Sequence, residues 1–223
     1  MREMVLVATP ARLSTPELLM ERAAVLAARL TYQPRTRALY LNEQSEGQGK
    51  YWPNAVARNT LIARFLRPEH DWVLWVDVDI IDYPADLVER LMTVARRHAG
   101  ETWPAIVAPM VWMERVGEGA VSLSTGGWFY DIGGFVALDG RHADFHAGPQ
   151  GHDAEQELAS VGCVYLAPAG LYRQGLRYRP DGDEVEHLSF MKAARGAGAK
   201  VIATRGIEVR HAYLPKYGER WHG

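Results

Sequence analysis

The chain of 223 residues contains a single cysteine, Cys163, and carries little net charge and no long apolar run. One cysteine excludes a disulfide framework within the chain and any zinc site built from several cysteines. A formal net charge of -2 gives no overall attraction to polyphosphate or to an anionic membrane. No apolar stretch approaches the roughly 20 residues that a membrane-spanning helix needs. We therefore expect a soluble, cytoplasmic protein with neither a signal peptide nor a membrane span.

The sequence also lacks internal repeats, low-complexity tracts and linker-like stretches. With apolar residues making up 48% of the chain, there is enough hydrophobic material for one sizeable core. We expect a single domain over residues 1–223.

The first half of the chain alternates short apolar runs with amphipathic segments. Four runs are expected to be strands: Met4–Ala8, Ala38–Leu41, Trp72–Val76 and Ala105–Pro109. Three segments have helical spacing of their apolar residues: Thr15–Leu30, Asn54–Leu66 and Pro84–Arg97. This alternation predicts an α/β fold with a mostly parallel central sheet and helices on both faces.

Regular alternation stops after Val111. The segment Glu114–Gly151 is rich in glycine and aromatic residues and is expected to form hairpins and loops. Order is expected to return with a strand, a helix, a second strand and a last extended segment, at Cys163–Ala167, Val185–Ala197, Lys200–Ala203 and Ile207–His211.

The triplet Asp77-Val78-Asp79 directly follows the apolar run Trp72–Val76. Open α/β sheets bind their ligands at the carboxyl ends of the strands. Carboxylates there suit a hard divalent cation such as Mn²⁺ or Mg²⁺, which would neutralise the charge of a departing diphosphate. The alternative is that both aspartates only form a turn or cap a helix. The covered strand in front of them favours metal or nucleotide binding, because buried carboxylates need a counter-charge.

Arg58 and Asn59 lie on the helix that precedes this strand. A guanidinium suits a diphosphate, and the amide of Asn59 has donors and acceptors that suit a base or a ribose. A surface arginine and an ordinary helical asparagine are the alternative for this pair.

Two further residues stand at the ends of later elements. Glu186 belongs to the acidic run Asp181–Glu186 at the start of a helix, where carboxylates are favoured for electrostatic reasons alone. His211 ends the strand-like segment Ile207–His211, where its imidazole could be a third metal ligand or an ordinary structural side chain.

Taken together, these motifs resemble the fungal mannan-polymerase α-mannosyltransferases, the Anp1-like family of retaining enzymes with the GT-A fold. The resemblance runs along most of the chain. It is most specific from Ala57-Arg58-Asn59 through Trp72–Asp79 to Tyr83-Pro84. It continues in Val107–Trp112, Tyr130-Asp131, Val161-Gly162, Glu184-Val185-Glu186, Gly198 and Val209–Tyr213.

The resemblance implies a GT-A, Rossmann-like nucleotide-diphospho-sugar transferase fold and a site for a nucleoside diphosphate sugar. Thr9 and Pro10 resemble the end of the family's first strand and its nucleotide loop. Asp77, Asp79 and His211 are implied to hold Mn²⁺, or Mg²⁺, at the diphosphate. Glu186 matches an acidic position near the reacting sugar, and it is the expected catalytic residue together with Asp79. The implied donor is GDP-mannose, with a UDP-hexose as the alternative.

Some positions depart from the family pattern. His187 stands where the family usually has glycine, Ala159 where it commonly has aspartate, and Val76 where a basic residue often precedes the triplet. The first two concern the acceptor side and the third the choice of donor. The fungal enzymes also have a membrane anchor, so this chain is expected to be a soluble bacterial or viral relative.

The expected function is metal-dependent transfer of a hexose, mannose-like by resemblance, with retention at the anomeric carbon. The acceptor stays open between a glycan, a small molecule and a modified polymer, and a homo-oligomer is left open. Two alternatives remain. One is a non-catalytic GT-A subunit of a glycosyltransferase complex. The other is a glycosyltransferase acting on modified nucleic acid through a basic face containing Arg96, Arg97 or the Arg173–Arg179 segment.

Overall fold

The amino-terminal strands form the parallel part of a mixed sheet. The computed structural model describes residues 3–12, 15, 17–33, 35–42, 52–100, 102–115, 134–141, 155–181 and 184–213. Strands β1 (Met4–Arg12), β2 (Arg35–Asn42) and β3 (His70–Val76) lie in the order β2-β1-β3, all parallel. The runs Val5–Ala8 and Trp72–Val76 are buried, as expected for strands covered on both faces.

The later strands make the sheet mixed. Strand β7 (Val164–Pro168) runs antiparallel to both β3 and β5 (Ile106–Arg115), and β5 is parallel to β8 (Val201–Tyr213). The short strands β4 (Ile80–Asp82) and β6 (Glu155–Glu157) pair antiparallel with β8. Over the described residues the order is β2-β1-β3-β7-β5-β8-β4, with β6 beside β8. The expected α/β class is confirmed. The expected parallel pairing is present among β1, β2 and β3 and between β5 and β8. Strand β7, which lies between these two groups, is antiparallel to both of its neighbours, β3 and β5.

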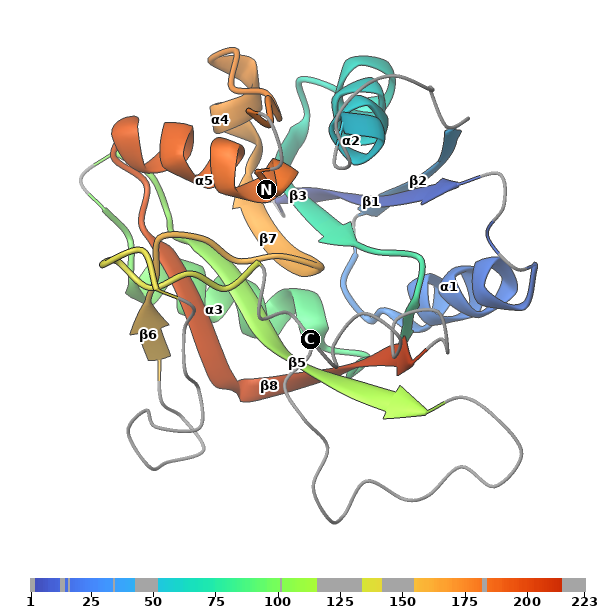
Figure 1. Ribbon diagram of the computed structural model, residues 1–223. Helices are drawn as coiled ribbons and strands as arrows, with labels where there is room; N and C mark the ends of the chain where they lie inside the picture. Colours follow the sequence, from blue (N-terminus) through green and yellow to red (C-terminus); the bar gives the residue numbers. More distant parts are fainter. Residues whose placement is uncertain are drawn as a thin grey trace, which may run out of the picture.

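Strand β8 contains two segments that the sequence analysis expects to be separate. Residues 200–203 and 207–211 look like two strands, yet they belong to one strand that bends where its pairing with β5 shifts (Figure 1). Thr204 is opposite Pro109, and the next residue of β5, Met110, is opposite Glu208. Residues 205–207 are therefore an excess on β8, which is how a bulge bends a strand.

Helices cover both faces of the sheet (Figure 1). On one side, α2 (Trp52–Phe65) packs on β1 and β2 and contacts α5 (Glu186–Gly196), while α4 (Ala169–Arg173) packs on β3 and β7. On the other side, α3 (Leu87–Arg97) packs its apolar face on β5, β7 and β8. Among the described residues, no helix has the length and apolarity that crossing a membrane requires.

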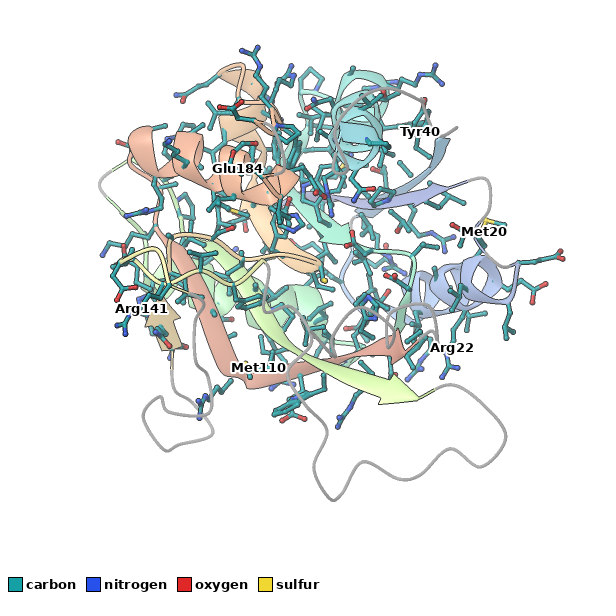
Figure 2. The ribbon with its side chains drawn as sticks, viewed as in Figure 1. Met20, Arg22, Tyr40, Met110, Arg141 and Glu184 are labelled. Carbon is teal, nitrogen blue, oxygen red and sulfur yellow. The ribbon has the colours of Figure 1, made fainter. Side chains whose placement is uncertain are left out.

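Helix α1 (Glu17–Arg29) packs beside β4 at the edge of the sheet. Its Arg22 donates a hydrogen bond from Nε to the carbonyl of Ile81 at 2.9 Å, and Figure 2 shows this side chain beside the end of the sheet. The expected helix Thr15–Leu30 is therefore confirmed with slightly shorter bounds. Of the expected hairpin segment Glu114–Gly151, most lies outside the described residues, as do Tyr130-Asp131 of the resemblance.

Candidate active site

Asp77, Val78 and Asp79 form the turn between β3 and β4. The amide of Asp77 donates to the carbonyl of Cys163 at 3.1 Å, and the carbonyl of Asp77 accepts from the amide of Ile80 at 3.1 Å. The first bond anchors the turn to the segment entering β7, and the second closes it. The acidic triplet thus lies at the carboxyl end of a buried strand, where its sequence position predicts it.

Pairing between β4 and β8 brings Asp79 to His211. The amide of Ala212 donates to the carbonyl of Asp79 at 2.8 Å, and Ile80 is paired with His211. Nε2 of His211 lies 3.1 Å from Oδ1 of Asp79, and Nδ1 lies 2.8 Å from the carbonyl of Ala212. Burial would lower the pKa of His211, but the Asp79 carboxylate outweighs that effect and raises it.

Arg58 joins Asp77 to Glu186. Its Nη2 donates to Oδ1 of Asp77 at 2.7 Å, and its Nε donates to Oε1 of Glu186 at 3.3 Å. Arg58 comes from α2, Asp77 follows β3, and Glu186 is the first residue of α5. Arg58 and Glu186 are each 1% exposed. The structure therefore gathers five of the predicted site residues at this edge of the sheet: Arg58, Asp77, Asp79, Glu186 and His211.

The two carboxylates beside Arg58 differ in their pKa. Removal from bulk water raises the pKa of Asp77 to about 6; Arg58 opposes this rise, and the neighbouring Asp79 adds to it. Burial would also raise the pKa of Glu186, but His187 and Arg58 outweigh it and lower that pKa. Glu186 therefore stays ionised to a lower pH than Asp77 does.

An aromatic cage surrounds the guanidinium of Arg58. Its central carbon lies 5.0 Å from the ring centroid of Trp75, 5.9 Å from that of Tyr165 and 5.7 Å from that of Tyr178, distances at which cation–π attraction operates. Trp75 donates from Nε1 to the hydroxyl of Tyr172 at 2.7 Å. That hydroxyl lies 3.0 Å from the hydroxyl of Tyr178, which lies 2.6 Å from that of Tyr165.

Sequence reasoning does not identify these tyrosines. Only Tyr165 gives a signal, as a polar-tipped residue inside the buried run Val164–Ala167, directly opposite Trp75 in the sheet. The inward orientation of Arg58 has a clearer signal, because it shares a helical face with Ala55 and Ile62, both buried.

The remaining predicted ligand residues have different positions. Thr9 and Pro10 lie in the second half of β1, directly after Ala8, which is paired with Trp75 of β3. The amide of Asn59 is occupied: Nδ2 donates to the carbonyl of Tyr178 at 2.9 Å, and Oδ1 accepts from the amide of Tyr178 at 3.0 Å. The predicted nucleotide contact of Asn59 therefore gains no support. Its side chain instead connects α2 to the segment before α5 through these two hydrogen bonds.

The arginines considered for a basic face are engaged elsewhere. Arg96 pairs with Glu3 and Arg97 with Glu155. Arg173 donates to backbone carbonyls of residues 67, 68 and 70, and Arg177 donates to those of residues 172 and 176. Nothing in these contacts supports the nucleic-acid alternative.

The predicted metal ligands are only partly assembled. Asp79 and His211 meet, whereas Asp77 is paired with Arg58, and the part of the chain that the structure describes contains no group of three or more His, Cys, Asp or Glu side chains placed to hold an ion. The chemistry of the pair still fits a divalent cation. A histidine ligand usually donates its other ring N–H to a backbone carbonyl, and Nδ1 of His211 has that partner in Ala212.

Comparison with known sequences places the chain near fungal mannan-polymerase subunits. The sequence model of the Anp1 family matches residues 54–136. Mannan polymerase complex subunit mnn9 of Schizosaccharomyces pombe is 44% identical over 48 residues, covering 22% of this chain and 13% of that protein. The ANP1 subunit of mannan polymerase II complex of Saccharomyces cerevisiae is 26% identical over 193 residues, covering 75% and 37%. The matches thus span 13% of the first relative and 37% of the second.

Solved structures share the fold. Staphylococcus aureus TarS in complex with UDP-GlcNAc superposes with a TM-score of 0.54 at 12% identity, covering 96% of this chain and 59% of that one. A mutant Drosophila β1,4-galactosyltransferase 7, complexed with manganese, UDP-Gal and xylobiose, gives 0.52 at 14% identity, covering 100% and 76%. These neighbours are GT-A glycosyltransferases. The chain therefore has the GT-A fold, and its sequence is similar to the Anp1 family over residues 54–136.

Proposed function

We propose that this protein is a metal-dependent, retaining glycosyltransferase that uses a nucleoside diphosphate sugar. The observation that carries the proposal is the meeting of Asp79 with His211 beside the Asp77–Arg58–Glu186 group at the carboxyl end of β3. That edge of an open α/β sheet is where ligands bind. The GT-A fold and the Anp1-like sequence agree with this activity.

Asp79 and His211 would hold Mn²⁺ or Mg²⁺, with Asp77 adjacent. The bound ion would supply positive charge to the leaving diphosphate. Thr9 and Pro10, in the second half of the neighbouring strand β1, would contact the nucleotide. Arg58 keeps Asp77 turned toward α2, with its Nη2 engaged by Asp77 and its Nε by Glu186.

Glu186 would act on the reacting sugar. Its lowered pKa keeps it ionised, so it can stabilise the positive charge that develops at the anomeric carbon. Retention is compatible with same-face attack by the acceptor or with a covalent intermediate on this carboxylate. A mannose-like hexose is the proposed cargo, from GDP-mannose or a UDP-hexose, and the acceptor is a glycan, a small molecule or a modified polymer.

A non-catalytic subunit is the second candidate. It is favoured by the ion pair between Arg58 and Asp77, which engages one of the proposed metal ligands. The relatives' names, which describe subunits of mannan polymerase complexes, point the same way. Such a subunit would keep the fold and bind nucleotide without turning over the donor.

Thermal unfolding with GDP-, UDP- and ADP-sugars, each with and without Mn²⁺, tests the proposal. A bound donor stabilises the native state by mass action, by about 2.7 kcal/mol when its concentration is 100 times the dissociation constant. We expect one nucleotide series to raise Tm only with Mn²⁺, and Asp79→Asn and His211→Ala to abolish that rise. Asp86→Asn is the matched control, because its carboxylate is exposed and pairs only loosely with Arg90.

Manganese-dependent hydrolysis of the stabilising donor then separates the two candidates. Hydrolysis that disappears in Asp79→Asn supports the enzyme, and binding without hydrolysis supports the non-catalytic subunit. No stabilisation by any nucleotide sugar would exclude both.

A further inference from the structure

Three polar atoms at the start of α5 are buried without a hydrogen-bond partner. They are Oε2 of Glu186, Nδ1 of His187 and Nη1 of Arg58. Their side chains are 1%, 8% and 1% exposed. An unsatisfied buried polar atom costs about 1–3 kcal/mol, and it is uncommon enough in native proteins that each case needs a reason.

These atoms belong to one connected group. Nδ1 of His187 lies 3.4 Å from Oε1 of Glu186, and Nε of Arg58 lies 3.3 Å from the same oxygen. The side chains that carry the unpartnered atoms therefore meet at Oε1 of Glu186. One ligand bound beside this oxygen would offer partners to all three atoms, whereas three unrelated defects would each carry their own cost.

The charges around the group restrict the chemistry of that ligand. An anion would meet the carboxylates of Glu186 and Asp77, and a cation would meet the guanidinium of Arg58, so a neutral group is favoured. Oε2 is an acceptor, Nη1–H is a donor, and an imidazole nitrogen serves as either. A hydroxyl group both donates and accepts, so hydroxyls of a neutral polyol match this set.

We infer that Glu186, His187 and Arg58 form a subsite for a hydroxyl group of the transferred sugar, with His187 as the specificity-determining residue. The inference rests on the proposed function, because it assigns the sugar part of the donor to this subsite. It goes further by giving His187 a role: it selects donors that carry a free hydroxyl at one ring position. His187 is suited to this role because its imidazole nitrogen can donate or accept a hydrogen bond next to Glu186.

Calorimetric binding of nucleoside diphosphate and of nucleoside diphosphate sugar measures the contribution of the sugar. In the wild type, with Mn²⁺, we expect the sugar to tighten binding by about 10-fold, the size of one or two good hydrogen bonds. His187→Phe should lose that gain while binding the free nucleotide unchanged, and His187→Gln should keep most of it. His98→Phe is the control, a substitution at a partly exposed histidine paired with Glu155.

Donor analogues with single hydroxyls removed identify the contact. One deoxy position should weaken binding to the wild type by about 10-fold and to His187→Phe by little, since the bond is already lost there. Circular dichroism checks that both variants fold, and the analogue series on the wild type and His187→Gln gives the answer if His187→Phe does not.

The outcomes are separable. Absence of nucleotide binding by the wild type removes the proposed function and this inference with it. Normal nucleotide binding with an unchanged sugar contribution in His187→Phe, or with no deoxy position that couples to residue 187, overturns the inference and leaves the proposed function intact.

Discussion

The backbone at Cys163 adopts a left-handed conformation, with a φ of 54°. The amide of Val164 donates to the carbonyl of Gly162 at 2.7 Å, so Cys163 is the central residue of a γ-turn of the strained, positive-φ kind. Its own carbonyl accepts the amide of Asp77. Strain of this kind concentrates where the surrounding structure needs a particular geometry, and here it fixes the start of the acidic turn.

Alanine and glycine should reverse their usual order of stability at this position. A Cβ atom in the left-handed region costs about 1–2 kcal/mol, so we expect Cys163→Gly to be more stable than Cys163→Ala by about 1 kcal/mol. At the exposed position Ala193 of α5, glycine should instead be the less stable residue by about 0.5–1 kcal/mol. Urea unfolding of the three variants measures these differences, and the same order at both positions would contradict the assignment of strain.

The guanidinium of Arg58 connects three elements of the fold, α2, β3 and α5. Arg58 of α2 contacts the residue after β3 and the first residue of α5. Helices α2 and α5 pack against each other, and this contact encloses the ion pairs. The candidate site and the docking of α5 are therefore parts of one arrangement.

Removal of Arg58 should be more harmful than removal of the whole Arg58–Glu186 pair. Arg58→Met leaves the carboxylate of Glu186 buried without its counter-charge, which costs about 3–5 kcal/mol in comparable pairs. Adding Glu186→Gln removes that charge, so we expect the double variant to unfold at higher urea than Arg58→Met alone. Arg64→Met, on the same helix with its guanidinium over the ring of the half-buried Tyr40, should cost less than about 1 kcal/mol. Simple additivity of the two substitutions would contradict the coupling.

Periodicity and apolar runs predict most of the elements, and their limits are physical. The pattern of α3 is read correctly because its apolar residues all face β5, β7 and β8. The antiparallel direction of β7 cannot be predicted from its sequence. Strand direction depends on the path of the chain between strands, and a short apolar run has the same pattern in either direction. Strand β8 is split in the prediction because Thr204-Arg205-Gly206 separates its two apolar stretches.

The candidate site is predicted in composition and less well in arrangement. Asp77 and Asp79 follow from their place after β3, and His211 from the resemblance. The pairing of Asp77 with Arg58 depends on the packing of α2 on α5, which a single sequence does not encode locally. The same holds for Asn59, whose amide is held by the backbone of Tyr178 from a distant segment.

His70, the first residue of β3, forms a hydrogen bond to β2 through its neutral imidazole, and this contact makes the stability of the whole molecule depend on pH. Its Nδ1 accepts the amide of Arg67 at 2.9 Å, and its Nε2 therefore donates to Oγ1 of Thr36 at 2.6 Å. The residue is 1% exposed. Burial lowers the pKa of His70 below its ordinary 6.5, although the nearby Glu69 opposes this and Arg173 adds to it.

Global stability should consequently fall as the solution is acidified. Below about pH 6.5 the unfolded chain binds a proton at this imidazole that the folded chain excludes, so the free energy of unfolding decreases until the lowered folded pKa is reached. We expect the stability advantage of the wild type over His70→Gln to be full near pH 7 and to shrink toward about pH 5. Thermal unfolding of both proteins across this range measures it, and an advantage that grows on acidification would refute it.

The excess residues 205–207 of β8 have a consequence for which side of the sheet each half of that strand serves. Paired residues in a parallel ladder point to the same face, so Val201 shares a face with Ile106, and Val209 shares a face with Val111. Ile106 and Val111 lie on opposite faces, because their positions along β5 differ by an odd number, and His211 lies on the same face as Val209, two residues before it. An uninterrupted β8 would put His211 on the same face as Val201. Because the excess is an odd number of residues, the two halves of β8 exchange the faces to which their alternate side chains point. The same strand therefore supplies core side chains in its first half and places the imidazole of His211 beside Asp79 in its second half.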